Sequence, residues 1–164
     1  MALARAIDGL AVAVAKVAMV FLLLLVAATI YEVVARYVFN MPTLWAFDVT
    51  YMLNGAIFAL GGAYTLRHRG HVRIDVLSAR LPPVANTAIT VAVYLGLLAP
   101  ALGFMVYGTA TRAYEAFLTG EVENASAWGP RVWPFFSVLL LGMICLLLQV
   151  LLEAARSVGN LVRK

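Results

Sequence analysis

The feature that most constrains this chain is the length of its apolar runs. No charged residue occurs between Lys16 and Glu32, and a second run near the other end reads LLLGMICLLLQVLL. A helix of about 20 apolar residues spans a bilayer core of ~30 Å, whereas barrel strands would alternate apolar and polar residues over about ten positions. Neither run alternates, and 64% of the residues are hydrophobic while 12% are charged. The sequence therefore predicts an all-α integral membrane protein.

Four transmembrane helices are expected in a single membrane domain that covers residues 1–164. The expected spans are residues 10–39, 44–66, 84–118 and 132–153. Pro100 interrupts the third span and predicts a kink or break there. Pro134 falls in the first turn of the fourth span, where a missing N–H does no harm. The first apolar segment, preceded by Arg5, is interpreted as a retained helix and not as a cleaved signal peptide.

Lysine and arginine residues are divided unevenly between the two sides of these spans. Nine of the 12 lie on one side: Arg5, Lys16, Arg67, Arg69, Arg73, Arg80, Arg156, Arg163 and Lys164. Arg36, Arg112 and Arg131 lie on the other. Because cytoplasmic segments carry the excess of positive charge, we expect both termini and the basic loop 67–83 in the cytoplasm. The net charge of +4 then reflects orientation in the membrane and not nucleic-acid binding.

The basic loop 67–83 carries a short apolar repeat. Ile74, Leu77 and Leu81 fall on one face if the segment is helical, which predicts a short amphipathic helix at the membrane surface with its arginines toward anionic headgroups. An alternation through Val72 and Val76 leaves an extended conformation open. The candidates for contact with lipid headgroups are Arg67, Arg69, His71, Arg73 and Arg80.

The two histidines, His68 and His71, lie among the arginines of this loop. Haem ligands in a membrane subunit would instead lie within facing helices, and Asp75 alone adds too few ligands for a metal site. We also find no nucleotide-binding loop and no nucleophile with a base nearby. The sequence therefore predicts no catalytic, cofactor or metal residues, and hence no enzyme.

The connection between the first two spans, YEVVARYVFNMPTLWAFD, concentrates the charges that the spans lack. Glu32 and Arg36 are four residues apart with the acid first, the favourable order for a helical pair. Asn40 and the proline that follows it end the helix, and Trp45 suits an interfacial anchor. Asp48 falls in the first turn of the next helix, where the helix dipole favours an anion.

We expect Glu32, Arg36 and Asp48 to lie close together at the tip of this hairpin. Two interpretations of the hairpin stay open: a salt-bridged turn that fixes how two helices meet, or a surface that docks another protein. The candidates for either role are Glu32, Arg36, Asn40, Trp45 and Asp48.

Polar residues within the spans are few, and Asn54 and Gln149 are the deepest of them. A self-sufficient transporter would carry an acid at mid-depth, and in the first helix the one candidate, Glu32, lies near the outer end. Asn54 suits a contact between helices, with a substrate ligand as the alternative.

Motifs in the first half of the chain resemble one known family. They are Glu32, Arg36-Tyr37-Val38-Phe39-Asn40, Pro42, Trp45 and Asp48, then Gly62-Ala63, Arg67 and the stretch Gly70-His71-Val72-Arg73-Ile74-Asp75-Val76-Leu77. In order and spacing, residues 32–82 are similar to the small membrane subunit of tripartite ATP-independent periplasmic (TRAP) transporters. The last two spans share only hydropathy and length with that family, which commonly has glutamate where this chain has Asp48.

The resemblance implies a non-catalytic scaffold subunit in a bacterial inner membrane. Its implied partners are a large multi-helix membrane subunit, a periplasmic substrate-binding protein and membrane lipids. The large subunit would carry the sodium and substrate sites, and the cargo would be an organic acid. The substrate would be chosen by the other two proteins.

Two other functions compete with the scaffold. A small stand-alone exporter working as a homodimer would rely on Glu32 as its coupling acid, although Arg36 one turn away would hold that acid ionised and occupied. A membrane anchor for a redox enzyme would need histidines within the spans, where the sequence has none.

Overall fold

The computed structural model describes residues 2–67 and 83–162, and this part of the chain is helical apart from two connections. Its elements are α1 (Ala2–Tyr37), α2 (Ala46–Arg67), α4 (Pro83–Val93), the π-helical turn η1 (Tyr94–Leu98), α5 (Ala99–Thr119) and α6 (Trp133–Val162). Because α4, η1 and α5 follow one another without a break, they make one long helix. The described residues therefore form four helices, which confirms the all-α prediction.

The expected amphipathic helix of the basic loop lies outside the described residues. So do four of the five candidates for lipid contact, Arg69, His71, Arg73 and Arg80.

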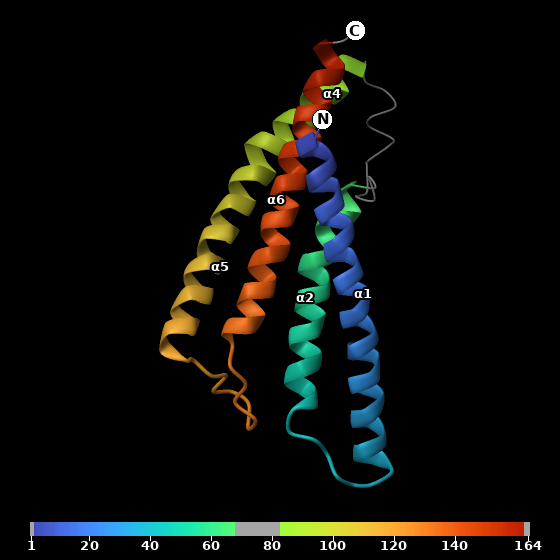
Figure 1. Ribbon diagram of the computed structural model, residues 1–164, viewed down its shortest axis with the longest axis vertical. Helices are drawn as coiled ribbons and strands as arrows, with labels where there is room; N and C mark the ends of the chain where they lie inside the picture. The colour runs from blue at the N-terminus through green and yellow to red at the C-terminus, as the bar shows by residue number, and fades with distance from the viewer. Residues whose placement is uncertain (1, 68–82, 163–164) are drawn as a thin grey trace.

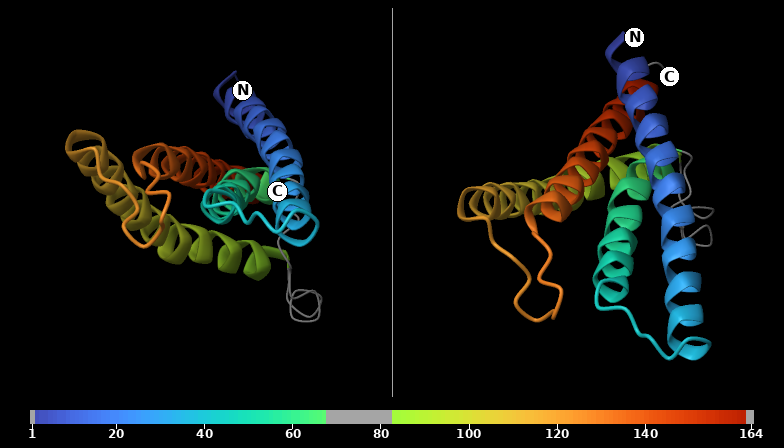
Figure 2. Two further views of the ribbon diagram at one scale, coloured as in Figure 1. Left: turned by 90° about the horizontal axis from the view of Figure 1, so that it is seen from below. Right: turned by 60° about the horizontal axis from the view of Figure 1, so that its bottom comes forward.

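In the view of Figure 1 the four helices extend between two ends of the molecule, and the turned view shows α5 and α6 inclined to α1 and α2 (Figure 2). Both termini and the start of α4 lie at one of these ends, which we call the terminal end. The connections 38–45 and 120–132 lie at the other, which we call the hairpin end. Helix α2 packs on α1 and on α6, and α6 also packs on α5, so the order across the molecule is α1, α2, α6, α5 (Figure 2).

Three helical segments of the described chain are long and apolar enough to cross a membrane: Ala4–Tyr37, Ala85–Thr119 and Trp133–Gly159. Helix α2 is not among them, because polar residues such as Asp48 and Asn54 lower its hydropathy. The helices also run past the expected spans at the terminal end, where α1 begins at Ala2 and α6 continues to Val162. Residues with high helix propensity, such as Ala, Leu, Arg and Glu, allow a helix to continue beyond its apolar core.

Pro100 changes the helix without breaking it. The residue follows the π-helical turn η1, in which the N–H of Ala99 donates to the carbonyl of Tyr94, five residues back. A proline ring clashes with the carbonyl four residues before it, and a wider turn relieves that clash. The long helix changes direction along its length (Figure 2), as a π-bulge next to a proline predicts.

The core lies where α1, α2 and α6 meet, and it is built largely from small side chains. Its buried residues are Ala11, Val14, Ala18, Leu60, Ala63 and Cys145. Helices α6 and α2 approach closely at Gly142, where an added Cβ would lie 2.6 Å from the carbonyl carbon of Ala59. Small residues let membrane helices pack backbone against backbone and gain dispersion energy over a long contact.

Candidate functional site at the hairpin end

Glu32 is the centre of a polar network that joins α1 to the first connection. Its Oε1 accepts a hydrogen bond from Arg36 Nε at 2.9 Å, and its Oε2 accepts one from the Thr43 N–H at 3.0 Å. The Thr43 hydroxyl donates to the same Oε2. The Glu32 side chain is 16% exposed while Arg36 is 53% exposed, so the acid is enclosed by its partners and the guanidinium faces outward.

Two further contacts fix the course of the connection. Asn40 adopts φ 52°, a left-handed conformation that asparagine tolerates better than most residues. The N–H of Met41 then donates to the Ala35 carbonyl at 2.9 Å, which satisfies a carbonyl at the end of α1. Trp45 stacks on Tyr31 with ring centroids 5.7 Å apart. The hairpin is therefore held by aromatic packing as well as by charge.

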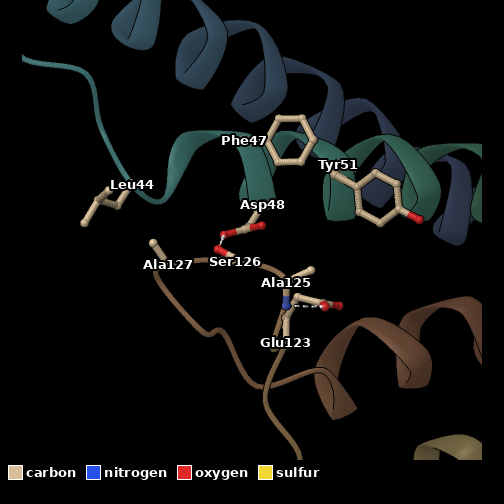
Figure 3. Close-up of a pocket in the computed structure, with 8 residues that line it drawn as sticks. All are labelled: Leu44, Phe47, Asp48, Tyr51, Glu123, Ala125, Ser126 and Ala127. Carbon is tan, nitrogen blue, oxygen red and sulfur yellow. Dashed lines mark hydrogen bonds between the residues drawn. The ribbon is translucent and has the colours of Figure 1, made fainter.

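Asp48 does not join Glu32 and Arg36, contrary to the expectation from the sequence. Its carboxylate accepts a hydrogen bond from the hydroxyl of Ser126, in the connection between α5 and α6 (Figure 3). The N–H of Trp128 donates in turn to Ser126 Oγ at 3.1 Å. Asp48 is only 6% exposed. From the first turn of α2 this acid faces the second connection, so it joins α2 to that connection at the hairpin end.

The second connection, residues 120–132, is held by contacts of its own. Val122 and Arg131 form an antiparallel bridge, and the N–H of Glu123 donates to the Pro130 carbonyl at 2.9 Å. Glu121 accepts a hydrogen bond from Arg112 of α5 at 3.1 Å. These contacts hold the loop in place and so bring Ser126 to Asp48.

A shallow pocket of about 450 Å³ opens between α2 and the second connection. Phe47 and Tyr51 of α2 lie on one side, and Glu123 and Ala125 lie on the other (Figure 3). Within the described residues no cluster of His, Cys, Asp and Glu could hold a metal ion. The pocket is mostly apolar, and its buried acid, Asp48, is already hydrogen-bonded to Ser126. The pocket therefore suits contact with another molecule better than it suits chemistry.

A second polar cluster lies at the terminal end and joins three helices. Asp8 of α1 contacts Arg156 Nη2 at 2.6 Å, Arg67 Nε at 3.5 Å and Gln149 Nε2 at 3.3 Å. Arg67, expected to face lipid headgroups, is thus directed toward Asp8. Gln149, expected to be one of the deepest polar residues within the spans, is 0% exposed. Both ends of the helix assembly are therefore fastened by side-chain contacts across helices.

Sequence reasoning missed Thr43, Ser126 and Asp8 as members of these networks. Asp8 is separated from Arg156 by 148 positions and Asp48 from Ser126 by 78. No local pattern indicates pairs this far apart. Thr43 carried a weak signal, since a hydroxyl directly after Pro42 in a turn can bind a nearby carboxylate.

Comparison with known protein families identifies the family of this chain. Residues 25–160 match the family described as "Tripartite ATP-independent periplasmic transporters, DctQ component". The chain belongs to this family. A search of curated proteins gave no match.

The match reaches beyond the motifs of residues 32–82 and takes in the second half of the chain, where the sequence had suggested only a likeness of hydropathy and length. A DctQ component is the small membrane component of a TRAP transporter, a multi-pass protein of the inner membrane. The family is not enzymatic, and it works together with a membrane partner and a periplasmic binding partner.

Proposed function

We propose that this DctQ component is a non-catalytic scaffold that pairs with the large membrane subunit of its transporter. In this proposal, uptake is driven by sodium, the cargo is an organic acid, and a periplasmic binding protein delivers it. The observation that carries the scaffold role is the use of three acids that are buried or partly buried. Glu32, Asp48 and Asp8 lie near helix ends and are each bound to side chains of this same chain.

Acids that are hydrogen-bonded to other side chains of the same protein stabilise its fold. They are poorly placed to bind and release a cation in every transport cycle. Conduction or coupling needs a site that fills and empties, whereas Glu32 would have to give up both Arg36 and Thr43. This same occupancy argues against the alternative, a stand-alone exporter that works as a homodimer with Glu32 as its coupling acid.

The hairpin end supports a docking role on the outer side of the membrane. Arg36 presents a largely exposed guanidinium there, and Phe39 and Met41 of the first connection are exposed beside it. Glu32, Asn40 and Trp45 hold this corner rigid, which lowers the entropy lost when a partner binds. In this proposal the hairpin end faces the periplasm, and the basic loop 67–83 contacts anionic lipid headgroups on the cytoplasmic side.

Reconstitution separates the scaffold from the exporter. This chain, the large subunit and the binding protein would be placed in liposomes together and in every smaller combination, with labelled organic acids and an imposed sodium gradient. We expect uptake only when all three proteins are present and the gradient points inward. Transport by this chain alone would overturn the scaffold proposal, and uptake by the full set without a sodium gradient would overturn sodium coupling.

A further inference from the structure

One face of α2 is largely exposed within the described residues, although Tyr51 on it contacts the ring of Phe135 of α6. The residues on it recur every third or fourth position and so share one side of the helix. They are Phe47, Tyr51, Asn54, Phe58, Gly61 and Thr65. Phe58 is 87% exposed and Phe47 is 77% exposed. The opposite face, which includes Ala56, Leu60 and Ala63, is buried against the other helices.

The part of this face from Phe58 to Thr65 borders a groove of about 790 Å³ between α2 and α5, and Asn54 precedes it on the same face without lining the groove. Phe58, Gly61 and Thr65 line it from α2, and Leu102 and Met105 line it from α5. Helix α6 lies between these two helices and closes the bottom of the groove with Leu139 and Met143. The groove is almost wholly apolar.

The hydrogen-bonding groups of Asn54 favour a protein helix over a lipid as the neighbour of this face. The Asn54 side chain is exposed and forms no hydrogen bond within residues 2–67 and 83–162. Asn54 is the ninth residue of α2 and lies roughly 12 Å along the helix from its first residue. An amide has two donors and an acceptor to satisfy, and acyl chains satisfy none of them. A helix that carries a hydrogen-bonding side chain can satisfy them, as polar residues do between membrane helices.

The two neighbouring glycines of α2 show where a second helix can approach. A Cβ at Gly62 would lie 3.5 Å from Leu146 of α6, so Gly62 serves packing inside the chain. A Cβ at Gly61 would meet nothing within 4 Å, so its backbone is open toward the groove. Gly61 therefore leaves room for the close backbone approach that small residues allow between membrane helices.

We propose that the α2–α5 groove seats a transmembrane helix of the large subunit, which crosses α2 at Gly61 and bonds the Asn54 amide with a polar side chain. This inference rests on the proposed function, because that function supplies the partner. It adds which surface of this chain the partner covers and what chemistry the facing helix must have.

The test uses the complex of full-length proteins. A photoreactive phenylalanine analogue replaces Phe58, and a matched control replaces Phe104 of α5, which is 79% exposed but does not line the groove. We expect position 58 to give an adduct with the large subunit, at a yield several-fold above that of position 104. Adducts at position 58 that contain mainly lipid, or a second copy of this chain, would overturn the proposal.

Two substitutions probe the contacts directly through co-purification with the large subunit. Gly61→Leu fills the groove and is expected to lower recovery of the partner on the order of tenfold, and Asn54→Leu on the order of threefold. The matched controls Gly108→Leu and Thr29→Leu change exposed positions of α5 and α1 and should leave recovery unchanged. Unchanged recovery with Gly61→Leu would contradict the assignment of the groove.

The outcomes separate this inference from the proposed function. If the unsubstituted chain fails to co-purify with the large subunit, the proposed function fails and the groove assignment with it. If the unsubstituted chain binds but neither the crosslink nor Gly61→Leu reports on the groove, only the assignment fails. Because a Cβ at Gly61 would meet nothing within 4 Å outside its own stretch of helix, and leucine favours a helix more than glycine does, Gly61→Leu should unfold at the same temperature as the unsubstituted chain or slightly above it.

Discussion

At the scale of single residues, the acids of the hairpin end differ in what they reach. Glu32 spans both Arg36 on its own helix and Thr43 across the turn, whereas Asp48 reaches Ser126 in the other connection. The resemblance to the TRAP family implies glutamate as the common residue at position 48. The shorter aspartate keeps the charge, and in this chain its contact stays inside the subunit.

The Thr43 hydroxyl is expected to contribute measurably to stability. Thr43→Val removes a donor to the enclosed carboxylate of Glu32 while it keeps the shape of the side chain. Hydrogen bonds to charged groups contribute about 1.5–3 kcal/mol, so the free energy of unfolding should fall by about 1–2 kcal/mol at this partly exposed site. Denaturant titration in mild detergent, followed by circular dichroism, measures it.

Thr29→Val is the matched control, because the Thr29 hydroxyl donates to the Leu25 carbonyl of its own helix. That carbonyl keeps its helical hydrogen bond, so the change should stay within about 0.5 kcal/mol. Equal effects of the two substitutions would show that the Glu32 network adds nothing to stability.

At the scale of elements, the contacts between helices depend on small residues at particular positions. Gly142 of α6 lies against the backbone of Ala59 in α2, and this contact sets how closely the two helices approach. The π-helical turn before Pro100 sets the course of the long helix in the same way. Neither feature involves a side chain with chemistry of its own.

Gly142→Ala should separate α2 from α6. Its new methyl group would lie 2.6 Å from the Ala59 carbonyl carbon, and such overpacking costs about 1–3 kcal/mol. Gly159→Ala on the same helix meets nothing within 4 Å and should be neutral or stabilising by up to about 1 kcal/mol. Thermal unfolding of both variants in detergent checks the pair. A Gly142→Ala variant as stable as the unsubstituted chain would contradict the close approach of the two helices.

At the scale of the whole molecule, each end is fastened by a different cluster. Asp8 joins α1, α2 and α6 at the terminal end, and the Asp48–Ser126 contact joins α2 to the second connection at the hairpin end. The distribution of lysine and arginine predicts which end faces which side of the membrane. The structure adds that the termini share one end and the connections share the other (Figure 1).

Labelling of single cysteines tests this orientation in intact cells. In a Cys145→Ser background, Asn40→Cys and Asn124→Cys should react with a membrane-impermeant thiol reagent added outside, and Ala4→Cys should react only after the inner membrane is broken. Asn40 and Asn124 are exposed in the two connections. Labelling of Ala4→Cys from outside would reverse the predicted topology.

The sequence by itself determined the helical class, the approximate course of four helices and the paired Glu32 and Arg36. Each of these depends on neighbours within a few turns, where apolar length and i, i+4 spacing govern the outcome. The tertiary structure alone decided that Asp48 binds Ser126, that Asp8 joins Arg67 and Arg156, and that Gly61 is open while Gly62 is packed. These contacts join residues 59 to 148 positions apart or distinguish adjacent ones. They depend on how the helices are rotated and spaced against each other, which the packing of small residues sets and no local pattern encodes.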